Sequence, residues 1–376
     1  LSVPGVPILP EALRDSGFTV GILGKVGHST PYKEFVWDFA VDQPDLGAGR
    51  SAQRYAAEAK AFFDEASETG KPFFLMANTH DPHRPFANSG QETGMRRRGL
   101  TLARPSRPFW PSEVTVPAFL PDIPEVRLEM AEYYSSVRRC DDVVGGVLDA
   151  LEESGQAQNT MVIFLSDHGM ALPFAKTNCY RHSTRTPLMI RWPGTIKAGS
   201  VDDDHFVSAI DLKPTILEAL EIEAPNGMDG RSFCSVLRGH EQEGRDRVFT
   251  QFHMTSAERA FPMRSVITRE SGYIFNAWAN GDTHFRNESQ SGRTFKAMQQ
   301  AAKTDEAIAE RVDLFVHRTP EELFDYGRDP DALRNLVEEA SAKETLARMR
   351  KLLEQWMEKS NDPLLETFRG YLAEKS

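Results

Sequence analysis

Three apolar, β-branched segments of this chain each run directly into a cluster of cationic or metal-binding residue types. Residues 18–23 lead to Lys25 and His28, residues 73–76 lead to the string His80-Asp-Pro-His83-Arg84, and residues 161–165 lead to Asp167 and His168. In open α/β sheets, ligands bind outside the carboxyl ends of the strands. We therefore expect the three strand ends to share one site that binds an oxyanion and a metal ion.

Length, charge and cysteine content narrow the classes of protein that are compatible with these strands. A chain of 376 residues can bury a large core and is long enough for two domains. Its net charge of -11 argues against nucleic-acid binding, which needs a broad basic face, although a few local cations can still bind a small anion. No apolar run is long enough for a transmembrane helix. The three cysteines form no CxxC motif and indicate neither a disulfide framework nor a zinc site.

The order of the expected elements indicates an α/β fold. Helices are expected at residues 9–16, 51–68 and 125–153, a fourth strand at 187–192, another helix from Asp211, and a long surface loop at 87–126. This alternation predicts a mostly parallel sheet sandwiched by helices over residues 1–245. Short strands followed by a final helix near 341–359 predict a smaller C-terminal α+β domain, with a small antiparallel sheet, over residues 246–376.

Asp167 and His168 are the candidate metal ligands. They follow the strand at 161–165 directly, and hard divalent cations prefer oxygen ligands and recruit carboxylates. The simpler interpretation is an Asp that caps a helix or loop, followed by an ordinary surface His. These two residues alone leave both interpretations open.

The other strand ends supply candidate anion-binding groups. His80, His83 and Arg84 place two imidazoles and a guanidinium together, and such a His can donate to an oxyanion or act as a general acid. The alternative is a polar turn, because Asp-Pro favours turns. Lys25 and Lys176 are each, taken singly, more typical of solvated loops. His182, between two arginines at 181 and 185, adds local positive charge beside Lys176.

Taken together and in order, these segments resemble the type I sulfatases of the alkaline phosphatase superfamily. The resemblance rests on residues 24–28, 71–75 with 80–83, 166–169, 176–178, 185–194, 211–215, 322–325, 329–330 and 335–336. It covers nearly the whole chain, and the ordered set is far more specific than any one motif. The strings at 80–84 and 261–265 are most similar to sulfamidase members, whereas the spacing of Lys25 and His28 is similar to iduronate-sulfatase-like members.

The resemblance implies an alkaline phosphatase-like fold and a role for each matching residue. Asp167 and His168 would bind a calcium ion, and Lys25 and Lys176 would hold sulfate oxygens. His28 would support the nucleophile, and His83 would protonate the departing oxygen or nitrogen. Substrate would be bound by further polar residues, namely His80, Arg84, His182, His253 and Arg264. For His253, the polarity of a surface loop is an equally good explanation.

Two features of the family pattern do not occur in this sequence. The family's nucleophile is a formylglycine made within a Cys/Ser-x-Pro-x-Arg motif, and its first strand ends in an Asp-Asp pair that binds the metal. Asp141 and Asp142 do not substitute for that pair, because they fall within the helix expected at 125–153. We expect both features in an N-terminal segment of roughly a hundred residues that precedes Leu1, so that the chain as given is incomplete and inactive.

These inferences predict a hydrolase of sulfate esters or sulfamates, with a sugar or glycosaminoglycan as substrate. A phosphodiesterase or phosphonate monoester hydrolase of the same superfamily is one alternative, and a non-catalytic protein that binds sulfated glycans is another. The choice between O-sulfate and N-sulfate stays open, as does the oligomeric state, for which a homodimer is one option. A periplasmic or extracellular location is expected for the full-length protein.

Overall fold

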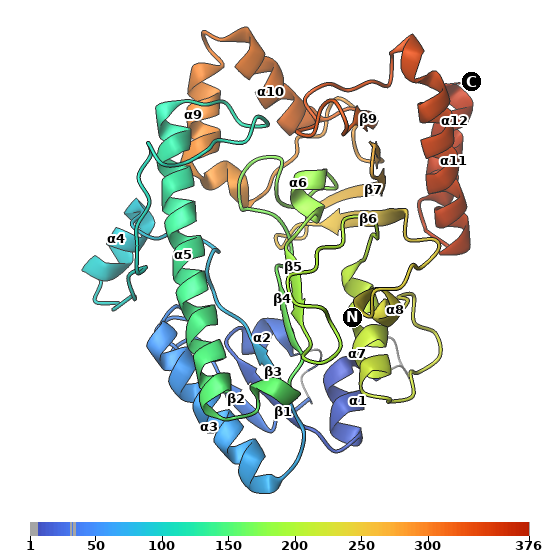
Figure 1. Ribbon diagram of the computed structural model, residues 1–376. Helices are drawn as coiled ribbons and strands as arrows, with labels where there is room; N and C mark the ends of the chain where they lie inside the picture. The colour runs from blue at the N-terminus through green and yellow to red at the C-terminus, as the bar shows by residue number, and fades with distance from the viewer. Residues whose placement is uncertain (1–6, 31, 33–34, 376) are drawn as a thin grey trace.

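The N-terminal part of the chain is built around a small parallel sheet (Figure 1). The structure, a computed structural model, describes residues 7–30, 32 and 35–375. In this sheet β1 (Thr19–Leu23) lies between β2 (Phe39–Val41) and β3 (Phe73–Ala77), and both pairings are parallel. All five residues of β1 are buried, as expected for a central strand covered on both faces.

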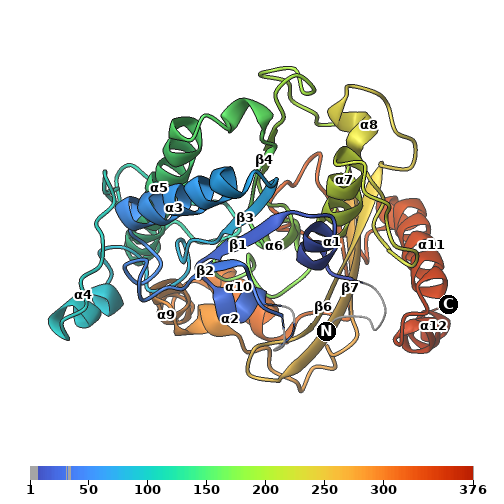
Figure 2. The same cartoon turned by 90° about the horizontal axis from the view of Figure 1, so that it is seen from below.

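Helices cover both faces of this sheet (Figure 2). α3 (Ala52–Thr69) and α5 (Pro124–Glu153) pack on one face, and α1 (Leu9–Asp15) and α7 (Leu212–Ala219) pack on the other. The first interface buries Leu23, Tyr55, Phe62, Phe63, Val143 and Leu151, and the second buries Leu13, Val20, Ile22, Trp37 and Leu217. Successive residues of β1 thus point to opposite faces.

The predicted boundaries of α3 are confirmed and have local causes. The Ser51 hydroxyl accepts a hydrogen bond from the Arg54 N–H at 3.4 Å, which caps the first turn. The helix ends at Gly70, whose φ of 64° places it in the left-handed region that favours glycine.

The third and fourth predicted strands form, but they do not extend the parallel sheet. β4 (Val162–Leu165) pairs antiparallel with β5 (Leu188–Arg191), and over the described residues this ladder has no pairing with β1, β2 or β3. Its residues are half-buried or exposed, unlike those of β1. The α/β class is confirmed, with parallel pairing confined to three strands.

A four-stranded antiparallel sheet forms the C-terminal part, in the order β6-β7-β8-β9. Its strands are β6 (Arg247–Met254), β7 (Ala260–Thr268), β8 (Ser271–Asn276) and β9 (Glu321–Asp325). One face packs against α11 (Lys343–Lys359) and α12 (Leu365–Glu374), which stand along one side of the molecule in Figure 1. The smaller C-terminal α+β part is therefore present, and its first strand begins close to the predicted boundary at residue 245.

The other face of this sheet contributes to the largest hydrophobic cluster of the protein. The cluster also takes residues from α5, from the loop at 171–180, and from α9 (Arg293–Ala301) and α10 (Glu306–His317). Its members include Met130, Phe174, Tyr180, Met263, Phe295, Phe315 and Phe324. Apolar packing thus joins residues from both sides of position 245.

Some local expectations differ from the structure. The loop predicted at 87–126 contains α4 (Gly90–Arg97), which begins after Ser89, whose hydroxyl accepts a hydrogen bond from the Glu92 N–H at 3.1 Å. Glycines at 90 and 94 conceal this helix in the sequence pattern. No helix within the described part of the chain is long and apolar enough to cross a membrane.

Candidate functional site

The carboxyl ends of β1 and β3 meet, as predicted. Asn78, just after β3, donates a hydrogen bond from Nδ2 to the Gly24 carbonyl at 3.2 Å, just after β1. Lys25 follows, with a φ of 52°, and precedes the one-turn helix α2 (Val26–Ser29). Burial lowers the pKa of His80 to about 4, and the nearby charges of Arg50 and Lys25 act in the same direction. Lys25 and His80 therefore share one edge of the sheet.

The loop that carries the predicted histidines is fixed by a buried carboxylate. Asp81 is 3% exposed and accepts hydrogen bonds from Arg139 of α5, at 2.5 and 3.1 Å, and from Arg50, at 3.3 Å. Arg139 also donates to Glu92 at 2.5 Å, and Arg50 donates to the His83 carbonyl at 3.3 Å. A buried carboxylate flanked by two guanidinium groups satisfies the hydrogen-bonding needs of all three groups. Asp81 is thus structural, and it positions His80 and His83.

Three basic side chains converge on the carboxylate of Glu288, of which His83 is a cation only when it is protonated. Lys176 Nζ lies 2.6 Å from Oε2, His83 Nε2 lies 3.7 Å from Oε2, and Arg84 Nε lies 3.9 Å from Oε1. We refer to Lys176, His83 and Arg84 as the cation cluster. Burial acts to raise the pKa of Glu288, but the hydrogen bond and charge of Lys176, with the charges of His83 and Arg84, hold it below its ordinary value. The site therefore stabilises an anion in the middle of the cluster.

The segment that carries Glu288 also fixes the backbone around Lys176. Asn287 Nδ2 donates to the Thr177 hydroxyl at 2.6 Å and to the Lys176 carbonyl at 3.3 Å. Asn178 Nδ2 donates to the same carbonyl at 2.9 Å. Lys176 itself is only 8% exposed. The backbone of Lys176 is thus held from two sides, by its own loop and by a segment far along the chain, and its ammonium group pairs with Glu288.

Within the described residues, one nitrogen of Arg84 has no hydrogen-bond acceptor at bonding distance, although it lies 3.9 Å from Glu288. Its Nη1 lies 2.6 Å from Glu129 of α5, and its Nη2 donates to the Ala171 carbonyl at 3.0 Å. Its Nε is buried without a hydrogen-bond partner. A buried donor left unpaired is costly, so this N–H is available to a ligand beside Glu288.

The described residues supply only part of a metal site. Asp167 and His168 follow β4; Asp167 is exposed and His168 is half-buried, and His168 Nε2 lies 3.5 Å from Asp167 Oδ2. Calcium takes about six to eight oxygen ligands. Over the described ranges, no group of three or more His, Cys, Asp or Glu side chains is placed to hold a metal ion. These two residues therefore do not complete a calcium site by themselves.

The loop of Asp167 and His168 lies close to Lys176 along the backbone. Gly169 donates a hydrogen bond to the Ser183 carbonyl at 3.0 Å, and a Cβ atom at Gly169 would lie 2.6 Å from the Ala175 carbonyl oxygen. No hydrogen bond or ion pair within the described chain, however, joins Asp167 or His168 to the cation cluster. The structure brings together His83, Arg84 and Lys176, but it leaves these two residues outside that contact.

The remaining predicted residues lie in different surroundings. His28 is exposed on α2. His182 stacks on Phe119, with ring centroids 4.2 Å apart, and burial lowers its pKa. Its Nε2 is 3.7 Å from the Asp331 carboxylate. His253 is exposed on β6, and partial burial lowers its pKa.

Arg264 requires a correction. It is 0% exposed, and its guanidinium is paired with Asp362 at 2.5 and 3.1 Å, on the side of the C-terminal sheet that faces α11. Its Nη1 donates to the Met263 carbonyl. Arg264 therefore stabilises the C-terminal sheet and does not face a ligand. Neighbouring side chains of β7 point to opposite faces of the sheet, so Met263 packs into the largest hydrophobic cluster and Arg264 points away from it. The sequence motif alone did not reveal which face Arg264 occupies.

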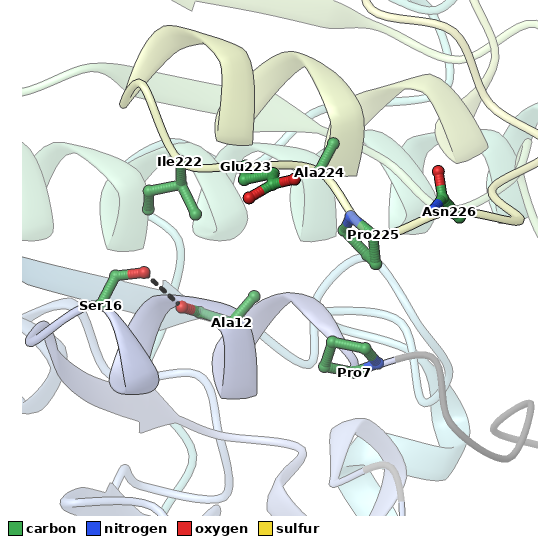
Figure 3. A pocket seen from close by; sticks show the side chains of 8 residues that line it. All are labelled: Pro7, Ala12, Ser16, Ile222, Glu223, Ala224, Pro225 and Asn226. Carbon is green, nitrogen blue, oxygen red and sulfur yellow. Dashed lines mark hydrogen bonds between the residues drawn. The ribbon is translucent and has the colours of Figure 1, made fainter.

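The described part of the structure contains at least two cavities. A groove of about 830 Å³ adjoins the cation cluster and is lined in part by Arg84, Glu129 and Arg293. A second cavity, of about 310 Å³, lies between α1 and residues 222–226 (Figure 3). Glu223 is the only titratable side chain among the described residues that line this second cavity, so it offers no cation to an oxyanion.

Comparisons with known proteins bear on the family to which this chain belongs. Residues 4–222 match the family model described as Sulfatase, and residues 167–280 match the model described as N-sulphoglucosamine sulphohydrolase, C-terminal. The chain is 28% identical over 389 residues to human N-sulphoglucosamine sulphohydrolase, covering 98% of this chain and 76% of that protein. Against two further curated relatives, the chain covers only 52% and 46% of their length.

Solved structures show the same fold. The structure of BT4656 in complex with its substrate D-glucosamine-2-N,6-O-disulfate matches with a TM-score of 0.62 and 18% identity, covering 96% of this chain and 83% of that one. The phosphonate monoester hydrolase of Agrobacterium radiobacter also matches, with a TM-score of 0.62 and 18% identity, covering 93% and 80%.

Proposed function

Because the chain belongs to the sulfatase family, we propose that it hydrolyses sulfate esters or sulfamates of a sugar, as part of a complete enzyme. Members of the family generally use a divalent cation and a formylglycine. Two relatives support a sugar substrate: human N-sulphoglucosamine sulphohydrolase by its name, and BT4656 by its bound D-glucosamine-2-N,6-O-disulfate.

The observation that carries this proposal is the convergence of Lys176, His83 and Arg84 on one carboxylate. Cations that are already positioned stabilise charge that develops on a transferring group, and they do so with little reorganisation. Lys176 would neutralise the equatorial oxygens of the sulfuryl group, and Lys25, beside His80, would do so from the sheet edge. The unpaired Arg84 Nε–H would add a further donor.

His83 is placed to act as the general acid under this proposal. One ring nitrogen, Nδ1, lies 2.8 Å from the Arg84 carbonyl oxygen, which fixes the ring, and Nε2 lies 3.7 Å from the Glu288 carboxylate. When protonated, Nε2 can give its proton to the departing oxygen or nitrogen. Half of this side chain is exposed, so the leaving group can remain in solvent.

Asp167 and His168 would supply two ligands of a divalent cation, whose role is to polarise the sulfuryl oxygens. The remaining ligands and the formylglycine would come from sequence other than this chain, which contains no Cys/Ser-x-Pro-x-Arg motif. The contribution proposed for this chain is therefore the binding of the anion and the transfer of a proton to the leaving group.

The test is expression of the full-length gene with a formylglycine-generating partner, followed by assays on an aryl sulfate, an aryl phosphonate and N-sulfated glucosamine. We predict that Lys176→Ala lowers kcat by about a hundred- to a thousandfold, by analogy with the loss of one oxyanion donor. Lys351→Ala, an exposed position on α11, is the control and should have no effect. A drop of less than about twofold for Lys176→Ala would refute the assigned role.

A phosphonate monoester hydrolase is the second candidate, because a solved enzyme of that class shares the fold. The cation cluster would suit a phosphonate as well as a sulfate, since both are tetrahedral oxyanions. Faster turnover of the aryl phosphonate than of either sulfated substrate would favour this candidate. Binding of sulfated glycans without any turnover would instead identify a non-catalytic glycan-binding protein.

A further inference from the structure

A groove of about 830 Å³ opens beside the cation cluster, between α4, the start of α5, and α9. Figure 1 shows α9 beside the N-terminal end of α5. This volume lies within the range of about 300 to 1,000 Å³ that is typical of small-molecule sites. The groove is therefore large enough to hold part of an oligosaccharide.

The groove is continuous with the proposed active site. Arg84 lines the groove and also reaches Glu288, and Ser291 and Gly292, which follow Glu288 closely, form part of the same wall. A Cβ atom at Gly292 would lie 2.5 Å from Arg84 Nη2 and 2.9 Å from Glu129 Oε1, so the wall can approach Arg84 closely only with glycine here. A ligand that begins at the cation cluster can thus extend directly into the groove.

One wall presents two cations with unused hydrogen-bond donors. Arg293 and Lys296 lie one turn apart on α9, and Gln300 follows on the next turn. Among the described residues, the Arg293 guanidinium pairs only with Glu132, at 3.5 Å. Lys296 is exposed and has no hydrogen bond or ion pair within the described chain. Together they can bind a carboxylate or sulfate group of a ligand.

The acidic side chains of the groove do not neutralise the positive charge of Arg293 and Lys296. Glu129 is neutralised by Arg84 at 2.6 Å, and it also accepts hydrogen bonds from the N–H groups of Arg293 and Thr294 at the start of α9. Burial raises the pKa of Glu132, an effect that Arg293 partly offsets. Glu125, in the first turn of α5, is exposed. The result is a lining that offers both donors and acceptors.

The rest of the lining suits a polyhydroxyl ligand better than an apolar one. Small side chains at Gly90, Ala297 and Ala301 leave room near the helices, and Gln91 and Ser291 add neutral hydrogen-bonding groups. None of the described lining residues is aromatic. We propose that this groove binds the further sugar units of an acidic oligosaccharide whose terminal sugar lies at the cation cluster. This inference rests on the function proposed above.

The test is calorimetric titration of the chain with two probes: N-sulfated glucosamine, and a tetrasaccharide of alternating uronic acid and N-sulfated glucosamine. Arg293→Ala combined with Lys296→Ala should raise the Kd of the tetrasaccharide about tenfold or more and leave that of the monosaccharide within about twofold. The control is Arg348→Ala with Lys351→Ala, an exposed Arg/Lys pair with the same spacing on α11. Lys296→Ala alone is not expected to disturb folding, because this exposed side chain has no partner among the described residues. It should raise the Kd of the tetrasaccharide by less than the double variant does.

The proposal is overturned if the double variant weakens both probes equally, or if it weakens neither. It is also overturned if a polyglutamate peptide of equal charge competes as well as the tetrasaccharide does, because the groove would then bind any polyanion. Turnover by the full-length enzyme separates the two proposals. If the tetrasaccharide binds in a way that depends on Arg293 and Lys296 but is not hydrolysed, the groove proposal is supported and the proposed activity is contradicted. If sulfated substrates are hydrolysed but tetrasaccharide binding does not depend on these two residues, the proposed activity is supported and the groove proposal is contradicted.

Discussion

Glu288 competes with any anion for the same three cations. Its carboxylate is 2.6 Å from Lys176 and within 3.9 Å of His83 and Arg84. A sulfate group that entered the cation cluster would therefore meet a fixed negative charge. Two unit charges about 4 Å apart repel each other by about 4 kcal/mol at an effective dielectric constant of about 20, before screening by salt.

We predict that Glu288→Gln strengthens the binding of inorganic sulfate by at least about fivefold, because the substitution removes this repulsion and keeps a hydrogen-bonding amide beside Lys176. The Kd of sulfate, measured by calorimetry, checks the prediction. Glu310→Gln, at an exposed position on α10, should leave the Kd unchanged. Weaker binding by Glu288→Gln would show that the carboxylate mainly holds Lys176 in place.

His80 should make the protein sensitive to mild acid. Its pKa is about 4 in the folded protein, whereas an unfolded histidine titrates near 6.5, so the unfolded chain takes up this proton first as the pH falls. The free energy of unfolding should therefore decrease as the pH is lowered from about 6.5 towards about 4. His80→Gln removes this titration and should reduce the loss of stability between about pH 7.5 and about pH 5, measured by urea unfolding. His240→Gln, an exposed control, should leave the loss of stability between these pH values unchanged. If His80→Gln loses as much stability in acid as the unsubstituted protein, the prediction is wrong.

At the scale of elements, helices with a clear apolar stripe and end signals were predictable. α3 is marked by Ser51 at its start and Gly70 at its end, and α5 by a long run of apolar positions at helical spacing. The final helix was expected near residues 341–359. α11 begins at Lys343, after a short 3-10 turn, and no side chain caps it.

The contacts that shape the site were not predictable, because they join distant parts of the chain. Lys176 and Glu288 are 112 residues apart, and Arg139 and Asp81 are 58 apart. From the sequence, a charged residue on a long helix, such as Arg139, is expected to be exposed to solvent. Its burial depends on which other segment packs against that face of the helix, and the sequence does not show this. A predicted strand end did identify His83, and the family resemblance identified Lys176; both lie at the Glu288 carboxylate.

The buried pair of Arg139 and Asp81 links α5 to the loop that carries His80 and His83. We predict that Arg139→Met lowers the free energy of unfolding by about 3 to 5 kcal/mol, because it leaves the buried Asp81 carboxylate partly uncompensated. Arg138→Met, next to it on α5 but exposed and paired with Asp141 and Asp142, should cost at most about 1 kcal/mol. Equal losses for the two variants, measured by urea unfolding, would contradict this assignment.

At the scale of the whole molecule, one hydrophobic cluster connects the two predicted domains. Phe315 of α10 is fully buried and packs against Phe174 from the N-terminal part and against Phe285 and Phe295 from the C-terminal part. The sequence predicted the change in architecture near residue 245, but it gave no sign of this shared core. Elements that bury their apolar surface against each other should unfold together.

We predict that Phe315→Ala destabilises the protein by about 3 to 5 kcal/mol and shifts a single thermal transition, because the cavity lies in the core common to both parts. Differential scanning calorimetry checks the shape of the transition. Val201→Ala, at a position that is 88% exposed, serves as the control. Two separate transitions, with only the later part of the chain affected, would show that the parts unfold independently.

The arrangement around Glu288 also bears on how proteins of this kind diversify. Asn287 and Glu288 lie on a connecting stretch after β8, whereas every cation they meet comes from the N-terminal part. Substitutions in that short stretch can change which anions bind, while the residues of the cation cluster stay the same. Related proteins with this fold would then differ in the anions that they bind because of this one stretch.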